Sequence, residues 1–223
     1  MKKLLAFSLL VIAATAANAD AAWLQYSIAS PGDLLLPWNR PDVYGLRLNM
    51  PYGENKGSVY GVDLGFVGVS DEDVIGLAVT CANVADMGAT EGLQIGVVAN
   101  RTKEVYGVQL AGALNWNEDV AYGLQIGGIN WFVGDAYGAS LGAFLLSNNS
   151  FTGFSAACLN YEMHKMSGFQ LGGINLAAES STGLQLGIVN ISKHHEGLQL
   201  GLVNINSSGF LPCFPGLNFN FSR

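Results

Sequence analysis

The sequence predicts an all-β repeat protein, a parallel β-solenoid of about eleven 15-residue coils with N- and C-terminal caps. Three observations predict this fold. A glycine-led pattern returns every 14 to 16 residues, apolar and polar side chains alternate within each copy, and the 223-residue chain combines 29 glycines with only 12% charged residues. Repeats this short cannot bury an apolar face alone and must stack. Alternation with period two is typical of strands rather than helices.

Residues 1–19 are expected to be a secretory signal peptide. Lys2 and Lys3 precede an apolar stretch that ends in the small-residue site Ala17-Asn18-Ala19. This order is typical of a bacterial leader, and the stretch is shorter than the ~18–20 apolar residues that a membrane-spanning helix needs. We expect the exported chain to begin near Asp20, where no cysteine is present to carry a lipid anchor.

Residues 20–44 and 210–223 do not follow the repeat and are expected to cap its two ends. Exposed strand edges recruit other strands unless they are covered, and prolines and bulky aromatic residues are suited to covering them. The residues behind this expectation are Trp23, Pro31, Pro37, Trp38 and Pro41 in the first segment and Pro212, Phe214, Pro215, Phe219 and Phe221 in the second.

The repeat domain is expected to cover residues 45–209. Its copies begin at Gly45, Gly61, Gly76, Gly92, Gly107, Gly123, Gly138, Gly153, Gly168, Gly183 and Gly197. Counted from that glycine, offsets one and three are apolar in every copy, whereas offset two is polar in all but one. This polar column contains Arg47, Asp63, Gln94, Gln109, Gln125, Ser140, Ser155, Gln170, Gln185 and Gln199. An asparagine column at offset seven contains Asn83, Asn130, Asn160, Asn175, Asn190 and Asn204.

In a parallel solenoid each column stacks on itself. Leucine then lies on leucine in the core, while glutamine and asparagine form hydrogen-bonded ladders on a polar face. Arg47 and Asp63 occupy the polar column of adjacent copies, so we expect them to pair. The apolar parity changes after offset four, which predicts a bend at the small residue there that turns offset six inward.

An antiparallel up-and-down barrel of the outer-membrane type is the alternative, with one strand and one turn per copy. Tyrosines before several of the leading glycines would then form an interfacial girdle, and residues 216–221 would form a closing strand. The register favours the solenoid, because antiparallel neighbours would place the glutamine column against the apolar residues at offset six. A fold that reverses direction would also be expected to repeat every two strands, but this pattern repeats every one.

Composition and side-chain placement point to no catalytic, cofactor or metal site. A net charge of −7 without a basic patch disfavours nucleic acid as a partner. His194 and His195 are expected to lie in a solvated turn, far in sequence from His164. The acidic residues 71–73 lack a regular calcium loop, and Ser140 and Ser155 have no base placed to activate them.

The three cysteines are too few and too scattered for a disulfide framework. Cys81 and Cys158 lie at offset five of their copies, in a column of apolar and small residues. We therefore expect them to be small buried hydrophobic side chains.

The copies of Gly-Leu-Gln-[Ile/Leu]-Gly-x-x-Asn, the segment Tyr44-Gly-Leu-Arg-Leu-Asn-Met-Pro-Tyr-Gly53 and the closing Leu-Pro-Cys-Phe-Pro-Gly-Leu-Asn-Phe resemble an uncharacterised family of bacterial surface-repeat proteins, some of them lipoproteins. The resemblance covers about residues 43–221. It implies a location in the envelope or at the surface and brings no established activity or catalytic residues. The chain departs from the lipoprotein members because it lacks their anchor cysteine.

These observations together predict a non-enzymatic exported protein of the periplasm, outer membrane or cell surface. It would act as a scaffold or adhesion-type binding module for an unknown envelope component. The glutamine and asparagine ladders and the aromatic cap residues are the expected contact surface. The alternative fold predicts a small pore or membrane structural protein. Neither reading fixes the oligomeric state, and no cofactor is expected.

Overall fold

The computed structural model of the chain describes residues 21–27, 42–209 and 211–221. These residues are all-β, with 88% of them in strands and none in a helix, and they form a parallel β-solenoid of about nine turns with a spacing of about 15 residues. The predicted fold class is therefore confirmed, with about nine turns where the repeat count predicted about eleven. The chain divides into two compact units, residues 1–103 and 104–223, which are described separately.

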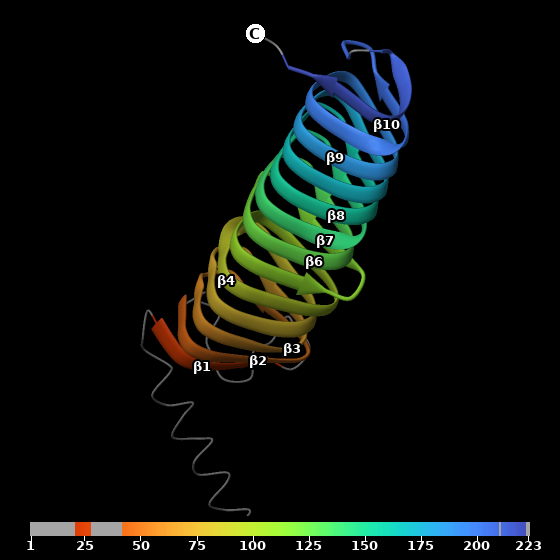
Figure 1. The fold of residues 1–223 in the computed structure, drawn as a ribbon. Coiled ribbons are helices and arrows are strands. Elements are labelled where there is room, and N and C mark those ends of the chain that lie inside the picture. The colour runs from red at the N-terminus through yellow and green to blue at the C-terminus, as the bar shows by residue number, and fades with distance from the viewer. Residues whose placement is uncertain (1–20, 28–41, 210, 222–223) are drawn as a thin grey trace, which may run out of the picture. The chain divides into compact units, whose positions relative to one another are not determined.

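The first unit contains three complete strands and the start of a fourth (Figure 1). These are β1 (Ala21–Ser27), β2 (Asp42–Asn55), β3 (Val59–Ser70) and the beginning of β4 (Val74–Ala111). Each pairs in parallel with the next, and residues at equal offsets face each other. Gly45 pairs with Gly61 at offset zero, and Arg47 pairs with Asp63 at offset two. β4 is long because it continues through successive corners without a break in strand geometry.

The second unit contains the end of β4 and six further strands, whose coils stack in register (Figure 1). These are β5 (Leu114–Asn117), β6 (Val120–Phe132), β7 (Asp135–Ser147), β8 (Ser150–Glu162), β9 (Lys165–Asn206) and β10 (Cys213–Asn220). Gly123 pairs with Gly138, and Gln125 pairs with Ser140. Because these neighbours run parallel, the antiparallel barrel is wrong for this chain. Within the described residues there is no helix of the length and apolarity needed to cross a bilayer.

The leading glycine of each copy is fixed by backbone conformation and by space. Gly138 has a φ of +127°, a region that other residues rarely adopt. A Cβ atom built on Gly138 would overlap the carbonyl oxygen of Gly123 in the preceding coil. The glycine column therefore marks the place where successive coils approach too closely for any side chain.

The interior is the reverse of the predicted one. Gln125 and Asn130 are 2% and 0% exposed, whereas Ile126, between them in sequence, is 38% exposed. Offsets two, four, seven and nine point inward, and the corner at offsets five and six turns both of its residues outward. The expectation that the leucines fill the core and that offset six turns inward is therefore wrong, although a change of parity does occur after offset four.

An apolar part of the interior lies beside the polar columns. In the second unit it is a cluster of Val105, Ala121, Phe132, Ala136, Leu145, Phe151 and Ala157. Val43, Val59 and Val74 are similarly buried in the first unit. In each unit, polar and apolar columns therefore share the interior.

The two segments expected as caps differ from each other. β1 adds a further parallel rung, in which Gln25 pairs with Arg47 of the polar column. β10 instead runs antiparallel to β9, with Leu217 opposite Leu200, and so occupies the edge of the last coil. Residues 1–19, which were expected to be a signal peptide, lie outside the described residues, as do Pro31, Pro37, Trp38, Pro41 and Phe210.

Candidate interaction surface

The glutamine column forms a buried amide ladder in the second unit. Gln199 Nε2 donates to Gln185 Oε1 at 2.7 Å, and Gln185 Nε2 donates to Gln170 Oε1 at 2.5 Å. Gln170 Nε2 then donates to Oε2 of Glu162 at 2.6 Å. All donors point toward the N-terminus, and the series ends on a carboxyl group. Because these side chains are buried, they cannot be the contact surface predicted for them.

The asparagine column forms a second ladder that runs the opposite way. Its Nδ2 groups donate to the Oδ1 of the next asparagine at 2.7–2.8 Å, in the series Asn160, Asn175, Asn190 and Asn204. Nδ2 of Asn204 ends the series on the backbone oxygens of Phe214 and Gly216, each at 3.1 Å. The same pairing joins Asn83 to Asn100 in the first unit and Asn115 to Asn130 in the second. This ladder is also fully enclosed.

Two members of the asparagine ladder were missed by the sequence analysis. Asn100 and Asn115 lie at offset eight rather than seven, because their coils carry one more residue in the corner. Between Asn130 and Asn160 the position is held by Leu145, which is buried and interrupts the ladder. Asn130 Nδ2 donates instead to the hydroxyl of Ser140 at 2.9 Å. Counting back from the next glycine would have found Asn115, which lies eight residues before Gly123 as Asn130 lies before Gly138, but not Asn100, which lies seven residues before Gly107.

The predicted pair of Arg47 and Asp63 is confirmed. Arg47 Nη2 lies 2.5 Å from Asp63 Oδ2, and both side chains are almost fully buried. Arg47 Nη1 also donates to the backbone oxygen of Val69 at 2.9 Å, and Asn49 Nδ2 donates to Asp63 Oδ1 at 2.5 Å. A buried charge pair is tolerated when such hydrogen bonds complete its shell.

Glu162 and His195 are buried titratable groups that the sequence analysis did not single out as interior. Burial raises the pKa of Glu162 to about 8, and the hydrogen bond from Gln170 offsets only part of that rise. Burial lowers the pKa of His195 to about 4, against the smaller opposing effects of the Leu198 backbone and the Glu196 charge. Both groups are therefore predominantly uncharged at neutral pH.

His195 contacts a serine, but the pair is enclosed inside the coil. Its Nδ1 lies 2.7 Å from Oγ of Ser181, which itself donates to Oγ of Ser192 at 2.9 Å. The tautomer of the imidazole determines which of the two groups donates in this contact. Both side chains are at most 1% exposed, so no substrate reaches them. The solvated turn predicted for His195 is wrong, because the residue lies inside β9.

The remaining candidate residues are dispersed. His164 Nδ1 contacts the backbone oxygen of Asn148 at 2.7 Å, and the exposed His194 points away from His195. Ser140 and Ser155 are buried in the polar column. In the turn at residues 71–73, the carboxylate of Asp73 accepts the backbone N–H of Ala89 at 2.8 Å. In the described part of the chain, no group of three His, Cys, Asp or Glu residues is placed to hold a metal ion.

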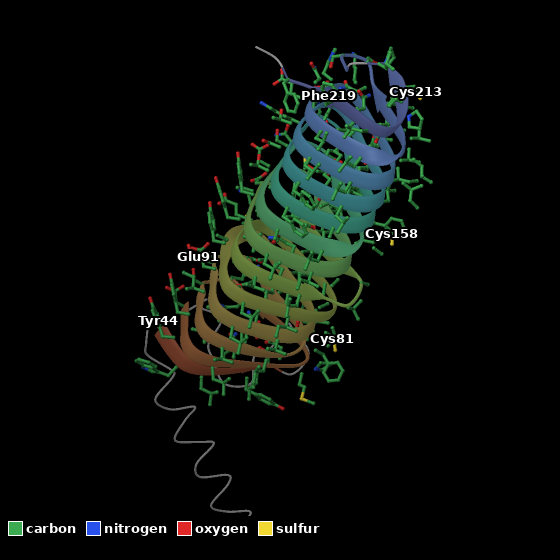
Figure 2. The ribbon with its side chains drawn as sticks, in the orientation of Figure 1. Tyr44, Cys81, Glu91, Cys158, Cys213 and Phe219 are labelled. Carbon is green, nitrogen blue, oxygen red and sulfur yellow. The ribbon has the colours of Figure 1, made fainter. Side chains whose placement is uncertain are left out.

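The cysteines also differ from the prediction. Cys81 is half-buried, Cys158 and Cys213 are exposed, and all three are free thiols. Cys158 lies at offset five, in the corner that turns outward, which is why it is not a core residue. In Figure 2, Cys158 projects from one side of the second unit, and side chains that end in oxygen line the opposite edge.

The outer surface of the second unit is divided into an apolar sector and a charged sector. The apolar sector is defined by offsets zero to eight of each coil, residues 107–115, 123–131, 138–146, 153–161, 168–176, 183–191 and 197–205. These ranges contain no Asp, Glu, Lys, Arg or His residue. The inward members are the ladders and small residues, so the outward members are almost all apolar. Every charged residue of 104–209 lies in the rest of the coil, the charged sector.

The most exposed part of the apolar sector is the corner. The corner column consists of the outward residues at offsets five and six, Phe144, Cys158, Ile174, Ile188, Leu202 and Val203. Ile174 is 42% exposed and Ile188 is 59% exposed. Large apolar side chains rarely remain this exposed in a continuous row unless the row contacts a partner.

Stacked aromatic residues border this sector on both sides. Just before the leading glycine, Tyr122 stacks on Tyr106 and on Tyr137 with ring centroids 5.4 and 4.7 Å apart. Tyr106 also donates from its hydroxyl to Oε2 of Glu104 at 3.1 Å, so its polar end faces the charged sector. Beyond the other end of the sector, Trp116 at offset nine stacks on Trp131 at offset eight, with ring centroids 5.3 Å apart.

The first unit has its own exposed apolar residues. Tyr44 and Tyr60 stack at 4.7 Å, and in Figure 2 Tyr44 and Glu91 project to one side while Cys81 projects to the other. An open depression of about 260 Å³ is lined by Leu48, Leu64 and Phe66 among others. It is shallow and apolar and presents almost no polar group to a ligand.

Comparison of the chain with models of protein families found no match, and comparisons with curated proteins and with solved structures found none either. The surface therefore has to be interpreted from its own chemistry.

Proposed function

We propose that this chain is an exported, non-catalytic envelope protein that serves as a scaffold or binding module. Its binding surface is the apolar sector of residues 104–209 rather than the amide ladders. One observation carries this proposal: outward apolar side chains form rows along successive coils over arcs that contain no charged residue.

The burial of the polar columns supports the proposal. Their amides and carboxyls are used inside the coils, where each bond supports the neighbouring coil. The chemistry left on the outside is apolar packing between aromatic borders. Apolar area is the main source of affinity in most protein associations, and contiguous apolar patches larger than a few hundred Å² are rare on monomeric proteins without a partner.

The leader sequence and the resemblance to surface-repeat proteins support an envelope location. Residues 1–19 have the order of a secretory signal, and the repeat resembles proteins of the bacterial surface. The pore-forming alternative required an antiparallel closed ring and is not proposed for a parallel coil.

The proposal is tested by fractionating cells that carry the full chain and two double variants. Ile174→Asp with Ile188→Asp charges the corner column. Ala178→Asp with Ser207→Asp adds the same charges to exposed positions of the charged sector. We expect the wild type and the control variant to remain with the envelope and the corner variant to appear in the soluble periplasmic fraction. Equal envelope retention of all three proteins would refute the proposal.

A further inference from the structure

We infer that the apolar sector of residues 104–209 docks on a lipid surface of zwitterionic headgroups, with the corner column inserted into the hydrocarbon. The inference rests on the proposed function and names the partner of the same surface. Four features of the second unit support it, and each favours hydrocarbon over a protein partner or a charged surface.

The first feature is the absence of charge over the whole sector. Offsets zero to eight contain no Asp, Glu, Lys, Arg or His residue in any coil from Gly107 to Asn204. Protein interfaces ordinarily carry polar groups at their rim that select one partner. A surface that selects hydrocarbon needs no such groups, and any charge within it is costly.

The second feature is the shape of the sector. It continues around the corner, so apolar side chains lie on both flanks, with Ile126 and Leu171 on one and the half-buried Leu176 and Ile191 on the other. A second copy packed face to face would cover only one flank. Hydrocarbon closes around both flanks at once, because lipid chains have no fixed shape.

The third feature is the size of the flanks. The flank from offset zero to four contains five residues, which at ~3.3 Å per residue is roughly 16 Å long. The hydrocarbon of one leaflet is about 15 Å thick, half of the ~30 Å core. The corner can therefore reach deep into one leaflet while the leading glycine remains at its boundary.

The fourth feature is the pair of aromatic borders. Tyr106, Tyr122 and Tyr137 lie at one boundary of the sector, and Trp116 and Trp131 lie at the other. Tyrosine and tryptophan are enriched where apolar and aqueous phases meet, because each has an apolar ring and one polar group. The hydroxyl of Tyr106 already turns toward a charged residue, Glu104.

The charged sector determines which lipids suit the surface. Acidic residues outnumber lysines there, with Glu118, Asp119, Asp135 and Glu179 among them. Anionic headgroups would be repelled by this sector at low ionic strength. A zwitterionic bilayer can bury the apolar side chains of the sector without that repulsion.

The experiment uses the full exported chain from Asp20 and the exposed thiol of Cys158 as a depth probe. Cys81 and Cys213 are replaced by serine, and Cys158 carries a polarity-sensitive fluorophore. The protein is titrated with phosphatidylcholine–phosphatidylethanolamine vesicles. We expect a blue shift, quenching by bromine atoms on the acyl chains, and weaker binding when anionic lipid is added at low salt.

The double variants of the fractionation experiment serve again as a matched pair. Ile174→Asp with Ile188→Asp should lower the vesicle partition coefficient about tenfold or more, because each carboxylate must leave water. Ala178→Asp with Ser207→Asp should leave it within about twofold. Circular dichroism spectra that coincide for all proteins exclude unfolding as the cause of a loss.

Three results would overturn the inference. These are no blue shift with vesicles, equal partitioning of the two double variants, or a soluble dimer in which the fluorophore is already shielded without lipid. If the envelope retention of the cells still depends on the corner column in any of these cases, the proposed function stands and the partner is a protein.

Discussion

Glu162 should make the stability of the second unit depend on pH. Its side chain is 0% exposed, and its Oε2 accepts the amide of Gln170 at 2.6 Å. Burial raises its pKa from 4.5 to about 8. The folded chain therefore retains a proton that the unfolded chain loses between those two values.

The sign follows from the tighter proton binding of the folded state. The free energy of unfolding falls as pH rises from 4.5 to 8, by about 1.4 kcal/mol per pH unit. His195 acts in the opposite sense. Its pKa is lowered from 6.5 to about 4, so its contribution is lost as pH falls through that window. The two slopes oppose each other between 4.5 and 6.5. Above 6.5 the effect of Glu162 is no longer opposed by that of His195, and stability falls by roughly 2 kcal/mol up to pH 8.

The Glu162→Gln variant isolates this effect, because glutamine has the same shape and no proton to lose. Urea unfolding followed by circular dichroism at several values between about pH 4.5 and 9 gives the free energies. At the alkaline end the variant should exceed the wild type by roughly 3–5 kcal/mol. Glu179→Gln, an exposed control in the same sector, should keep the wild-type decline. Parallel profiles for the wild type and Glu162→Gln would refute the reasoning.

Three further changes test the interior. Arg47→Met leaves Asp63 buried without its cation and should cost roughly 3–5 kcal/mol of unfolding free energy in the same urea assay. The double variant Arg47→Gln with Asp63→Gln rebuilds an amide rung and should remain within about 1 kcal/mol of wild type. Gly138→Ala forces a Cβ into the Gly123 carbonyl and should cost roughly 2–4 kcal/mol of unfolding free energy. Gly216 has a φ of +87° but no atom within 4 Å of a built Cβ, so Gly216→Ala should cost only about 1 kcal/mol. Equal losses would contradict the role of space. His195→Gln should remove the opposing slope, so that stability rises continuously from about pH 8 down to 4.5, and a profile like that of the wild type would show that His195 does not titrate as proposed.

The repeat period of the sequence predicted the fold well because it determines which residues pair between neighbouring coils. Glycine at offset zero and glutamine at offset two recur at intervals that bring like residues together only if neighbours are parallel. The pairs Gly123–Gly138 and Arg47–Asp63 are direct consequences. No tertiary information beyond the repeat was needed to choose the parallel solenoid over the barrel.

The direction in which each column points could not be predicted in the same way. Alternation shows that Gln125 and Ile126 lie on opposite faces, but it does not say which face is enclosed. The general tendency of leucine and isoleucine to be buried favoured the wrong choice. Amide ladders reverse it here, because stacked Gln and Asn side chains satisfy one another along the coil and lose little on burial.

Local features of the site were harder still. Asn115 was missed because one added corner residue shifts its offset, and His195 because its charged neighbours suggested a solvated turn. Cys158 was expected inside because its column is apolar, yet that column is the outward corner. In each case the polarity of the residues was clear from the sequence, and the path of the backbone around the corner was not.

The two amide series have consequences for how this chain can lengthen. Their donors run in opposite directions, one ending on the Glu162 carboxyl and the other on backbone oxygens of β10. Residues 183–196 lie between Glu162 and β10, and this segment contains neither of the groups on which the two series end. Duplicating that segment would insert one more identical link in both series and leave their endings untouched. Insertion or deletion of a whole coil at this place therefore keeps both series continuous. The same change beside Leu145 would fall where the asparagine series is already interrupted.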